Sequence, residues 1–151
     1  MRSKTNETRI RPFKPEDQEK VVGLWAECGL VVPQNNPERD IQRKLGVNSE
    51  LFLVGILGNE VVGTCMAGYE GHRGWINYLA VHPDYRRLGI ATIMMKAAED
   101  KLRKMGCPKI NVQIRISNQE VIKFYESIGF SDDQVVSMGK RLEDDAAHDI
   151  G

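Results

Sequence analysis

The stretch Tyr85-Arg86-Arg87-Leu88-Gly89-Ile90-Ala91 decides how this chain folds, because it joins an apolar, strand-like run to an amphipathic helix pattern. The run is residues 75–81, and the helix pattern starts at Ile90. The amides of a first helical turn have no partner within the helix and lie at the positive end of its dipole. A strand, a glycine-bearing turn and a helix in this order therefore predict a seat for a pyrophosphate.

The side chains of the stretch favour the same interpretation. Gly89 and Ala91 are small enough to let phosphate oxygens reach the backbone. Arg86 and Arg87 can each pair with a phosphate through planar, bidentate hydrogen bonds. Gly89 and Ala91 alone would be explained equally well by an ordinary structural turn, since short glycine motifs often match by chance. The position after a strand and the doubled arginine favour phosphate binding.

The composition indicates one domain without a broad basic face. The chain has 151 residues, and its 21 lysines and arginines equal its 21 aspartates and glutamates, which disfavours sequence-independent binding to nucleic acid. It has neither an apolar run of about 18 residues nor a leader-like start, so we expect a cytoplasmic protein without a membrane span. Cys28, Cys65 and Cys107 form no CxxC motif, which predicts reduced core residues and no metal site.

Hydrophobic periodicity predicts an α/β architecture in one domain, residues 1–151, with a folded core at 8–142 and a frayed acidic tail at 143–151. The expected order is strand, two helices, three strands, helix, strand, helix, strand, which gives a mixed sheet flanked by helices. The expected strands are residues 8–13, 51–57, 60–69, 75–81, 109–115 and 134–142, with a hairpin turn at Gly58-Asn59, and the expected helices follow Pro15, Pro37, Gly89 and the capping-box residue Ser117.

Three features together resemble the GNAT superfamily of N-acetyltransferases across nearly the whole chain. Arg86-x-x-Gly89-x-Ala91 matches the family's signature at the turn that binds coenzyme A pyrophosphate. The strand before it ends just ahead of this turn. Asn118, followed by Phe124-Tyr125 and Gly129-Phe130, resembles the family's closing segment. Small bacterial members of the ribosomal-protein-alanine acetyltransferase type are the most similar group.

The resemblance implies a mixed, mostly antiparallel sheet flanked by helices, with acetyl-CoA as co-substrate and a primary amine as acceptor. The acceptor would be a small molecule or a protein N-terminus. It would attack the thioester directly in a ternary complex, and the positioning of both substrates would supply much of the rate. The cofactor-binding residues that the resemblance implies are Leu79, Ala80, Val81, Arg86, Arg87, Leu88, Gly89, Ile90, Ala91, Asn118 and Tyr125.

Tyr125 and Asn118 each have a structural and a functional interpretation. Tyr125 lies on the apolar face of its predicted helix, which favours a core role, but the matching tyrosine of the family faces the departing sulfur. It would then be the general acid, because pKa values of about 8.5 for a thiol and about 10 for a phenol make the proton transfer feasible. Asn118 caps its helix, contacts the cofactor arm, or does both.

The strand at residues 79–81 has no reactive side chain, and as a sequence pattern it is a buried strand. The family implies that it parts from the strand at 109–115 and offers backbone groups to the pantetheine amides. An N–H near Val81 would then stabilise the oxyanion.

The general base is the least determined part of the site. In the ribosomal-protein-alanine type a glutamate precedes the Arg-x-Ser-Asn segment, but here Gln113 occupies this position and cannot accept a proton. Glu70 and His72 are the alternative bases, although such residues more often form a polar, solvated turn. A water chain oriented by Asn77 would also serve. His82, before a proline at a strand end, is more often structural than catalytic.

The acceptor and the rival functions stay open in the sequence. By analogy with a variable flap of the family, we expect Trp25, residues 30–32, Asn35 and Asn36 to border the acceptor. A non-catalytic acyl-CoA-binding sensor is the main alternative, because Gln113 replaces the expected carboxylate. Nucleic-acid binding is less favoured, and a homodimer is compatible with the sequence but not indicated by it.

Overall fold

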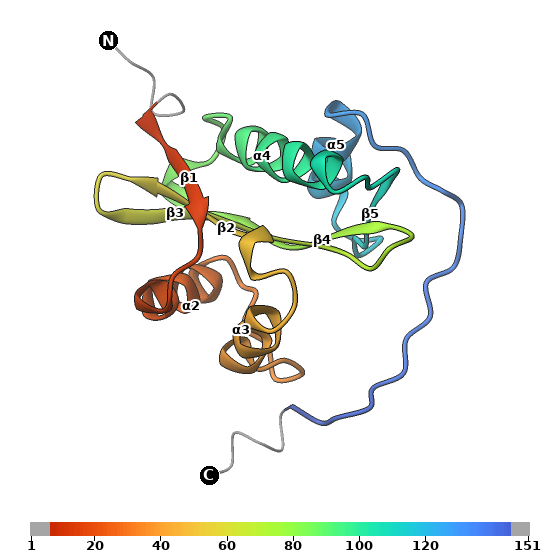
Figure 1. Ribbon diagram of the computed structural model, residues 1–151, viewed down its shortest axis with the longest axis horizontal. Helices are drawn as coiled ribbons and strands as arrows, with labels where there is room; N and C mark the ends of the chain where they lie inside the picture. The colour runs from red at the N-terminus through yellow and green to blue at the C-terminus, as the bar shows by residue number, and fades with distance from the viewer. Residues whose placement is uncertain (1–6, 146–151) are drawn as a thin grey trace.

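Five strands form one sheet in the order β1-β2-β3-β4-β5, so strands adjacent in the chain are also adjacent in the sheet (Figure 1). The computed structural model describes residues 7–145. Neighbouring strands are antiparallel except β4 and β5, which are parallel because α4 crosses between them. The strands are β1 (Arg9–Pro12), β2 (Phe52–Leu57), β3 (Glu60–Tyr69), β4 (Gly74–Val81) and β5 (Ile110–Val112), and the helices are α2 (Gln18–Glu27), α3 (Pro37–Leu45), α4 (Ile90–Lys104) and α5 (Gln119–Ser127).

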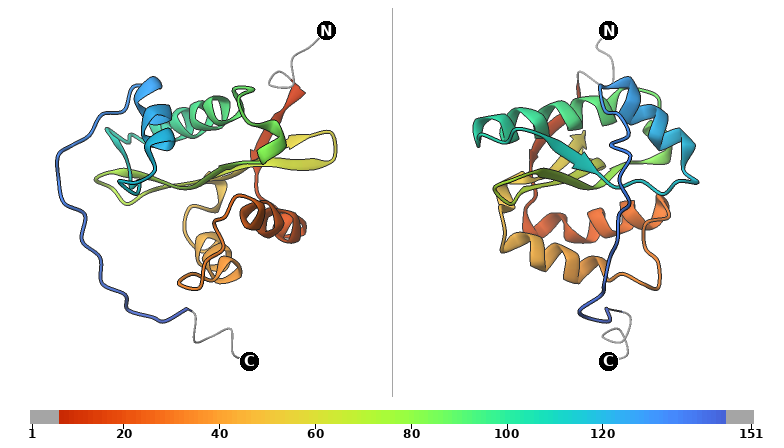
Figure 2. Two further views of the ribbon diagram at one scale, coloured as in Figure 1. Left: turned by 180° about the vertical axis from the view of Figure 1, so that it is seen from behind. Right: turned by 90° about the vertical axis from the view of Figure 1, so that its right-hand side faces the viewer.

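Helices cover both faces of the sheet, which confirms the predicted architecture (Figure 2). On one face, α2 and α3 enclose a core that includes Trp25, Ile41 and Phe52. On the other face, α4 and α5 enclose a core that includes Met94 and Tyr125. Because both faces are buried, β2 and β3 are almost continuously apolar rather than alternating.

Short-range sequence signals place most element ends where we expected them. Gly58 has φ +64° at the turn between β2 and β3, which the hairpin pattern predicts. Asn36 caps α3 by accepting a hydrogen bond from the Arg39 amide (3.1 Å). α4 begins directly after Gly89 and buries the apolar stripe that its periodicity predicts.

The expected last strand at residues 134–142 is wrong, because this segment pairs with no strand in the described part of the chain. Asp132 accepts a hydrogen bond from the Gln134 amide (2.7 Å), and Gln134 has φ +56°, so the chain turns away from β5. It then runs outside the β5 edge to the α3 side of the sheet (Figures 1 and 2). A strand needs neighbours to pack against as well as β-forming residues, and the apolar side chains here stay exposed: Val135, Val136, Met138 and Leu142.

Two smaller expectations also need correction. β5 covers only Ile110–Val112 of the expected 109–115, since within residues 7–145 it has β4 alone as a ladder partner. The residue that caps α5 is Asn118 rather than Ser117, because the Asn118 side chain accepts the hydrogen bond from the Val121 amide (3.3 Å).

The acidic tail begins against α3. Glu143 and Asp145 both form ion pairs with Arg43. The remainder of the tail that we expected to be frayed, residues 146–151, lies outside the described residues. Among the helices of residues 7–145, none is long and apolar enough to cross a membrane.

Candidate active site

The backbone of residues 85–90 forms a turn with two left-handed residues. β4 leads through a short 3-10 helix, Pro83–Tyr85, to Arg87 with φ +63° and Gly89 with φ +84°, and α4 begins at the next residue. Turns of this kind point successive backbone N–H groups toward one side, which makes a concavity that binds anions. Residues 86–89 are exposed, so the turn is open to a ligand from solvent.

The N-terminus of α4 differs from those of α3 and α5. The side chains of Asn36 and Asn118 cap α3 and α5, as the capping interpretation of Asn118 predicts. In contrast, α4 follows Gly89 without a side-chain cap and has no acidic residue in its first turn. Its first amides and the positive end of its dipole therefore suit an external anion. The backbone at this position fits the predicted pyrophosphate seat.

Arg86 joins the turn to the end of β4. Its Nε donates to the Val81 carbonyl oxygen (3.1 Å), which holds the guanidinium beside the start of α4. The neighbouring Arg87 is exposed on the same turn. Two arginines thus lie on the turn that leads into α4, and a guanidinium suits phosphate recognition.

β4 contains a bulge whose strained residue is Tyr78. The register with β3 shifts by one residue between Asn77 and Ala80, and Tyr78 has φ +50°. The Trp25 indole N–H donates to the Thr64 hydroxyl (2.9 Å), and this hydroxyl donates to the Tyr78 carbonyl (2.8 Å). The Tyr78 ring also stacks on Trp25, with the ring centroids 3.8 Å apart. A buried network therefore holds a backbone conformation that costs on the order of 1 kcal/mol by itself.

Past the bulge, β4 parts from β5. The ladder between the two strands ends at Ile76 and Val112, whereas β4 continues to Val81. Leu79, Ala80 and Val81 therefore lie where β4 has no β5 partner. This parting is the geometry that the family resemblance implies for backbone contacts to a pantetheine arm.

Tyr125 is buried in the core between the sheet, α4 and α5. Its ring makes edge contacts with Phe124 and Phe130, both at a centroid distance of 5.2 Å. Burial, with a smaller contribution from nearby Cys65, raises the pKa of the Tyr125 hydroxyl above its usual value. The phenol therefore keeps its proton at neutral pH, which a hydrogen-bond donor needs, while the driving force for complete transfer of that proton is reduced.

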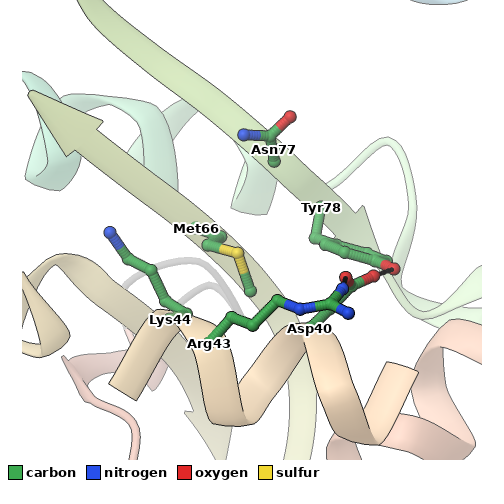
Figure 3. Close-up of a pocket in the computed structure, with 6 residues that line it drawn as sticks. All are labelled: Asp40, Arg43, Lys44, Met66, Asn77 and Tyr78. Atoms are coloured by element: carbon green, nitrogen blue, oxygen red, sulfur yellow. Dashed lines mark hydrogen bonds and ion pairs between the residues drawn. The ribbon is translucent and has the colours of Figure 1, made fainter. Parts of the chain in front are cut away.

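A cavity of about 370 Å³ lies between α3 and the bulge of β4 (Figure 3). A second cavity, of about 210 Å³, shares Lys44, Met66 and Asn77 with it and extends to Glu70 and Trp75. Charged side chains of both signs line the cavities, while most of the exposed wall is apolar, which suits a ligand that combines charged groups with an apolar part. The residues that line the larger cavity are Asp40, Arg43, Lys44, Met66, Asn77 and Tyr78.

Tyr78 and Asp40 are paired at one end of the larger cavity (Figure 3). The Tyr78 hydroxyl donates to Asp40 Oδ2 (2.6 Å) and accepts from Asn35 Nδ2 (2.7 Å). Burial and the hydrogen bond to Asp40 raise the pKa of the Tyr78 hydroxyl. The hydroxyl therefore stays a donor and fixes the orientation of the Asp40 carboxylate.

Glu70 closes its own turn at the smaller cavity. Its Oε1 accepts hydrogen bonds from the amides of Arg73 and His72, and these two donors lower the pKa of Glu70. A carboxylate with a lowered pKa is a weaker base than an ordinary one. The geometry thus suits the structural interpretation of the turn, and the role of Glu70 as a base stays a prediction.

Three other candidates have structural environments. His82 Nε2 lies within hydrogen-bond distance of Glu27 Oε2 (2.8 Å), and its Nδ1 accepts from the Asp84 amide (3.1 Å). Burial raises the pKa of Cys65 to about 12, so its thiol stays protonated and unreactive. The Gln113 amide donates to the Ser137 hydroxyl on the C-terminal segment.

Two of the residues expected to border the acceptor do not line the two cavities. Trp25 is fully buried under Tyr78 and Asn36 caps α3, so neither lines the cavities. The sequence interpretation did not single out Asp40 and Arg43, which line the larger cavity and lie three apart on one face of α3. That spacing was visible, but no local signal showed that Tyr78 would turn toward α3.

Comparison with known sequences gives one family. Residues 15–130 match the acetyltransferase (GNAT) family. The protein named acetyltransferase SG1711, from Sodalis glossinidius (strain morsitans), is 49% identical over 137 residues, which cover 90% of this chain and 96% of that protein.

Comparison with solved structures gives the same fold. AAC(6')-Iy in complex with the bisubstrate analog CoA-S-monomethyl-acetylneamine has a TM-score of 0.74 at 18% identity, over 89% of this chain and 99% of that one. The ribosomal-protein-S18-alanine N-acetyltransferase from Escherichia coli has a TM-score of 0.72 at 19% identity, over 84% of this chain and 79% of that one. At these identities the likeness shows the fold alone.

Proposed function

The chain belongs to the acetyltransferase (GNAT) family, and on this premise we propose that it transfers an acetyl group from acetyl-CoA to a primary amine by direct attack in a ternary complex. The acceptor is a small-molecule amine or a protein N-terminus. Acetyl-CoA is the co-substrate.

One observation carries the proposal: α4 starts without a cap next to the place where β4 and β5 part. The amides of residues 88–91, with Arg86 and Arg87, would hold the pyrophosphate. Leu79, Ala80 and Val81 would hydrogen-bond the pantetheine arm as a neighbouring strand does. Asn118, at the N-terminus of α5, would add a contact from the far side of the parting.

The transfer step follows from these placements. The bound ammonium first loses a proton to solvent; the neutral amine nitrogen then attacks the carbonyl carbon of the thioester, and an N–H near Val81 stabilises the oxyanion. The tetrahedral intermediate then collapses as the carbon–sulfur bond breaks. Tyr125 donates a hydrogen bond and the proton to the sulfur, while the proton of the attacking nitrogen leaves through water to Glu70. Because the pKa of Glu70 is lowered, most of the acceleration would come from positioning rather than from this base.

The two cavities on the α3 side of β4 are the proposed acceptor site. A primary amine is a cation at neutral pH, and Asp40, oriented by Tyr78, offers it a carboxylate. Asn77 lines both cavities, and Glu70 lines the smaller one. The acceptor would thus approach from one side of β4 and the cofactor from the other.

The test is calorimetric titration of acetyl-CoA into the wild-type chain and two glutamate variants at opposite ends of α4. Gly89→Glu places a carboxylate in the proposed pyrophosphate seat at φ +84°, and Gly106→Glu adds the same charge and side chain at φ +85° after the helix C-terminus. We expect Gly89→Glu to weaken binding by about 100-fold or more, a loss of about 2.7 kcal/mol. Gly106→Glu should bind as the wild type does.

Absence of binding by the wild type, or an equal loss in both variants, would contradict the proposed cofactor site. Binding without acetyl transfer to any member of a broad panel of amines and peptide N-termini would instead favour the alternative, a non-catalytic acyl-CoA sensor.

A further inference from the structure

The C-terminal segment ends in an ion-pair cluster on α3. The Arg43 guanidinium donates to both carboxylate oxygens of Asp145, with Nη1–Oδ2 at 2.9 Å and Nη2–Oδ1 at 2.7 Å. The same group reaches Glu143 Oε2 at 3.2 Å, and Arg39 lies 3.6 Å from Glu143 Oε1. Two carboxylates of one segment thus meet two arginines of one helix.

The contact with Asp145 is more than a loose surface pair. The Asp145 side chain is 6% exposed, although the tail residues before it are exposed. Arg43 engages it in a bidentate, planar arrangement, the geometry in which arginine recognises carboxylates best. This pairing also lowers the pKa of Asp145, so the carboxylate stays ionised at neutral pH.

The spacing of the four side chains explains the fit. Arg39 and Arg43 are four residues apart on α3, which puts their Cβ atoms about 5–6 Å apart on one face. Glu143 and Asp145 are two residues apart in a segment that bends at residues 142–143, and the carboxylates of both reach the arginines of α3. An acid-x-acid segment therefore matches the arginine pair of α3.

The arginine pair also adjoins the proposed acceptor site. Arg43 lines the larger cavity, where it lies 3.5 Å from Asp40 Oδ1. In Figure 3 the Arg43 guanidinium is beside Asp40 and Tyr78. A ligand carboxylate that enters this cavity beside its amine would meet the guanidinium that now holds Asp145.

We propose that Arg39 and Arg43 form a binding site for a pair of carboxylates, and that Glu143 and Asp145 of the chain itself occupy this site. Acceptors that carry carboxylates near their amine compete for it. The binding site stands on the ion pairs alone. Only its use by acceptors rests on the proposed acetyltransferase function. An acceptor of this kind displaces the tail segment that carries Glu143 and Asp145, whereas an amine without carboxylates does not need to displace it.

The binding test uses a fluorescently labelled peptide with the sequence of residues 139–151 and three full-length proteins: wild type, Glu143→Gln/Asp145→Asn, and the same double variant with Arg43→Gln. Fluorescence anisotropy measures the affinity. We expect the double variant to bind the peptide about tenfold or more tightly than the wild type, since a tethered tail competes at a high effective concentration. Added salt should weaken this binding, and Arg43→Gln should abolish it.

Two matched controls isolate the arginine pair. A peptide with glutamine and asparagine in place of Glu143 and Asp145 should not bind. Arg103→Gln, in the background of the double variant, removes an arginine that pairs with Glu99 and Asp100 on α4, and it should leave peptide binding unchanged. Equal peptide affinity in the wild type and the double variant, or equal affinity after Arg43→Gln, would overturn the proposal.

The kinetic test compares an amine without carboxylates with an amine that carries two carboxylates. In the double variant we expect KM for the acidic acceptor to fall about fivefold, while KM for the amine without carboxylates stays the same. If KM for the acidic acceptor is unchanged while peptide binding is intact, acidic acceptors do not bind at the arginine pair, and that part of the proposal is overturned. Complete absence of acetyl transfer with intact peptide binding would count against the proposed function and leave the binding site supported.

Discussion

The proposed cofactor turn and the proposed acceptor cavity are built in opposite ways. Residues 85–90 take their shape from consecutive residues, two of them left-handed, and present backbone amides. The larger cavity takes its walls from α3, β3 and β4, and it presents side chains. A site made of local backbone depends on a short sequence motif, whereas a site made of distant side chains depends on how the helices pack. Substitutions should therefore separate the two sites cleanly.

Among substitutions that leave the affinity for acetyl-CoA unchanged, Tyr125→Phe should lower kcat the most. The substitution keeps the ring contacts with Phe124 and Phe130 and removes the proposed donor to sulfur. We expect kcat to fall by about 100-fold, with the Kd of acetyl-CoA unchanged by calorimetry. If kcat stays at the wild-type value, Tyr125 is only a core residue, and the role of general acid that the family resemblance implies for it is wrong.

An intermediate effect, confined to the acceptor, should come from Tyr78→Phe. The Asp40 carboxylate loses its donor while the ring keeps its stack on Trp25. We expect KM for the acceptor to rise about tenfold, because one hydrogen bond to a charged group contributes about 1.5 kcal/mol, and the Kd of acetyl-CoA should not change.

Thermal unfolding of Tyr78→Phe should show a loss of about 1–2 kcal/mol in the free energy of unfolding. Tyr85→Phe serves as the control. It removes a hydroxyl that donates an exposed hydrogen bond to Glu60 Oε2 (3.0 Å), and the expected loss in the free energy of unfolding is below about 0.5 kcal/mol. A rise in the Kd of acetyl-CoA in Tyr78→Phe would break the separation of the two sites.

The smallest effect should come from Glu70→Gln. The backbone donors lower the pKa of Glu70, so its carboxylate is ionised above its ordinary pKa of about 4.3 and loses its favourable turn contacts only as the pH falls below that value. We therefore expect kcat/KM to rise with pH only through the pKa of the acceptor amine, and Glu70→Gln to lower it about threefold or less. A large loss, with a wild-type pKa between about 6 and 7 in the profile, would make Glu70 the base after all.

The same contrast describes how far the fold could be predicted. The hairpin at Gly58, the helix over Pro37–Leu45 and the start of α4 after Gly89 all depend on residues within a few positions, and the structure confirms them. The strand expected at residues 134–142 depends on an available sheet edge instead. The left-handed Gln134 and the ion pairs to α3 lead that segment elsewhere.

Most of the helices and strands, the mixed sheet and the turn before α4 could be predicted from the sequence, because periodicity, caps and glycine conformations act over one or two turns of chain. The proposed acceptor side depends on tertiary packing. Trp25 and Thr64 must pack behind β4 before Tyr78 can adopt its left-handed conformation and reach Asp40. Arg43 likewise meets Asp145 across 102 residues of chain. Such contacts depend on the relative placement of whole elements, which no short sequence pattern encodes.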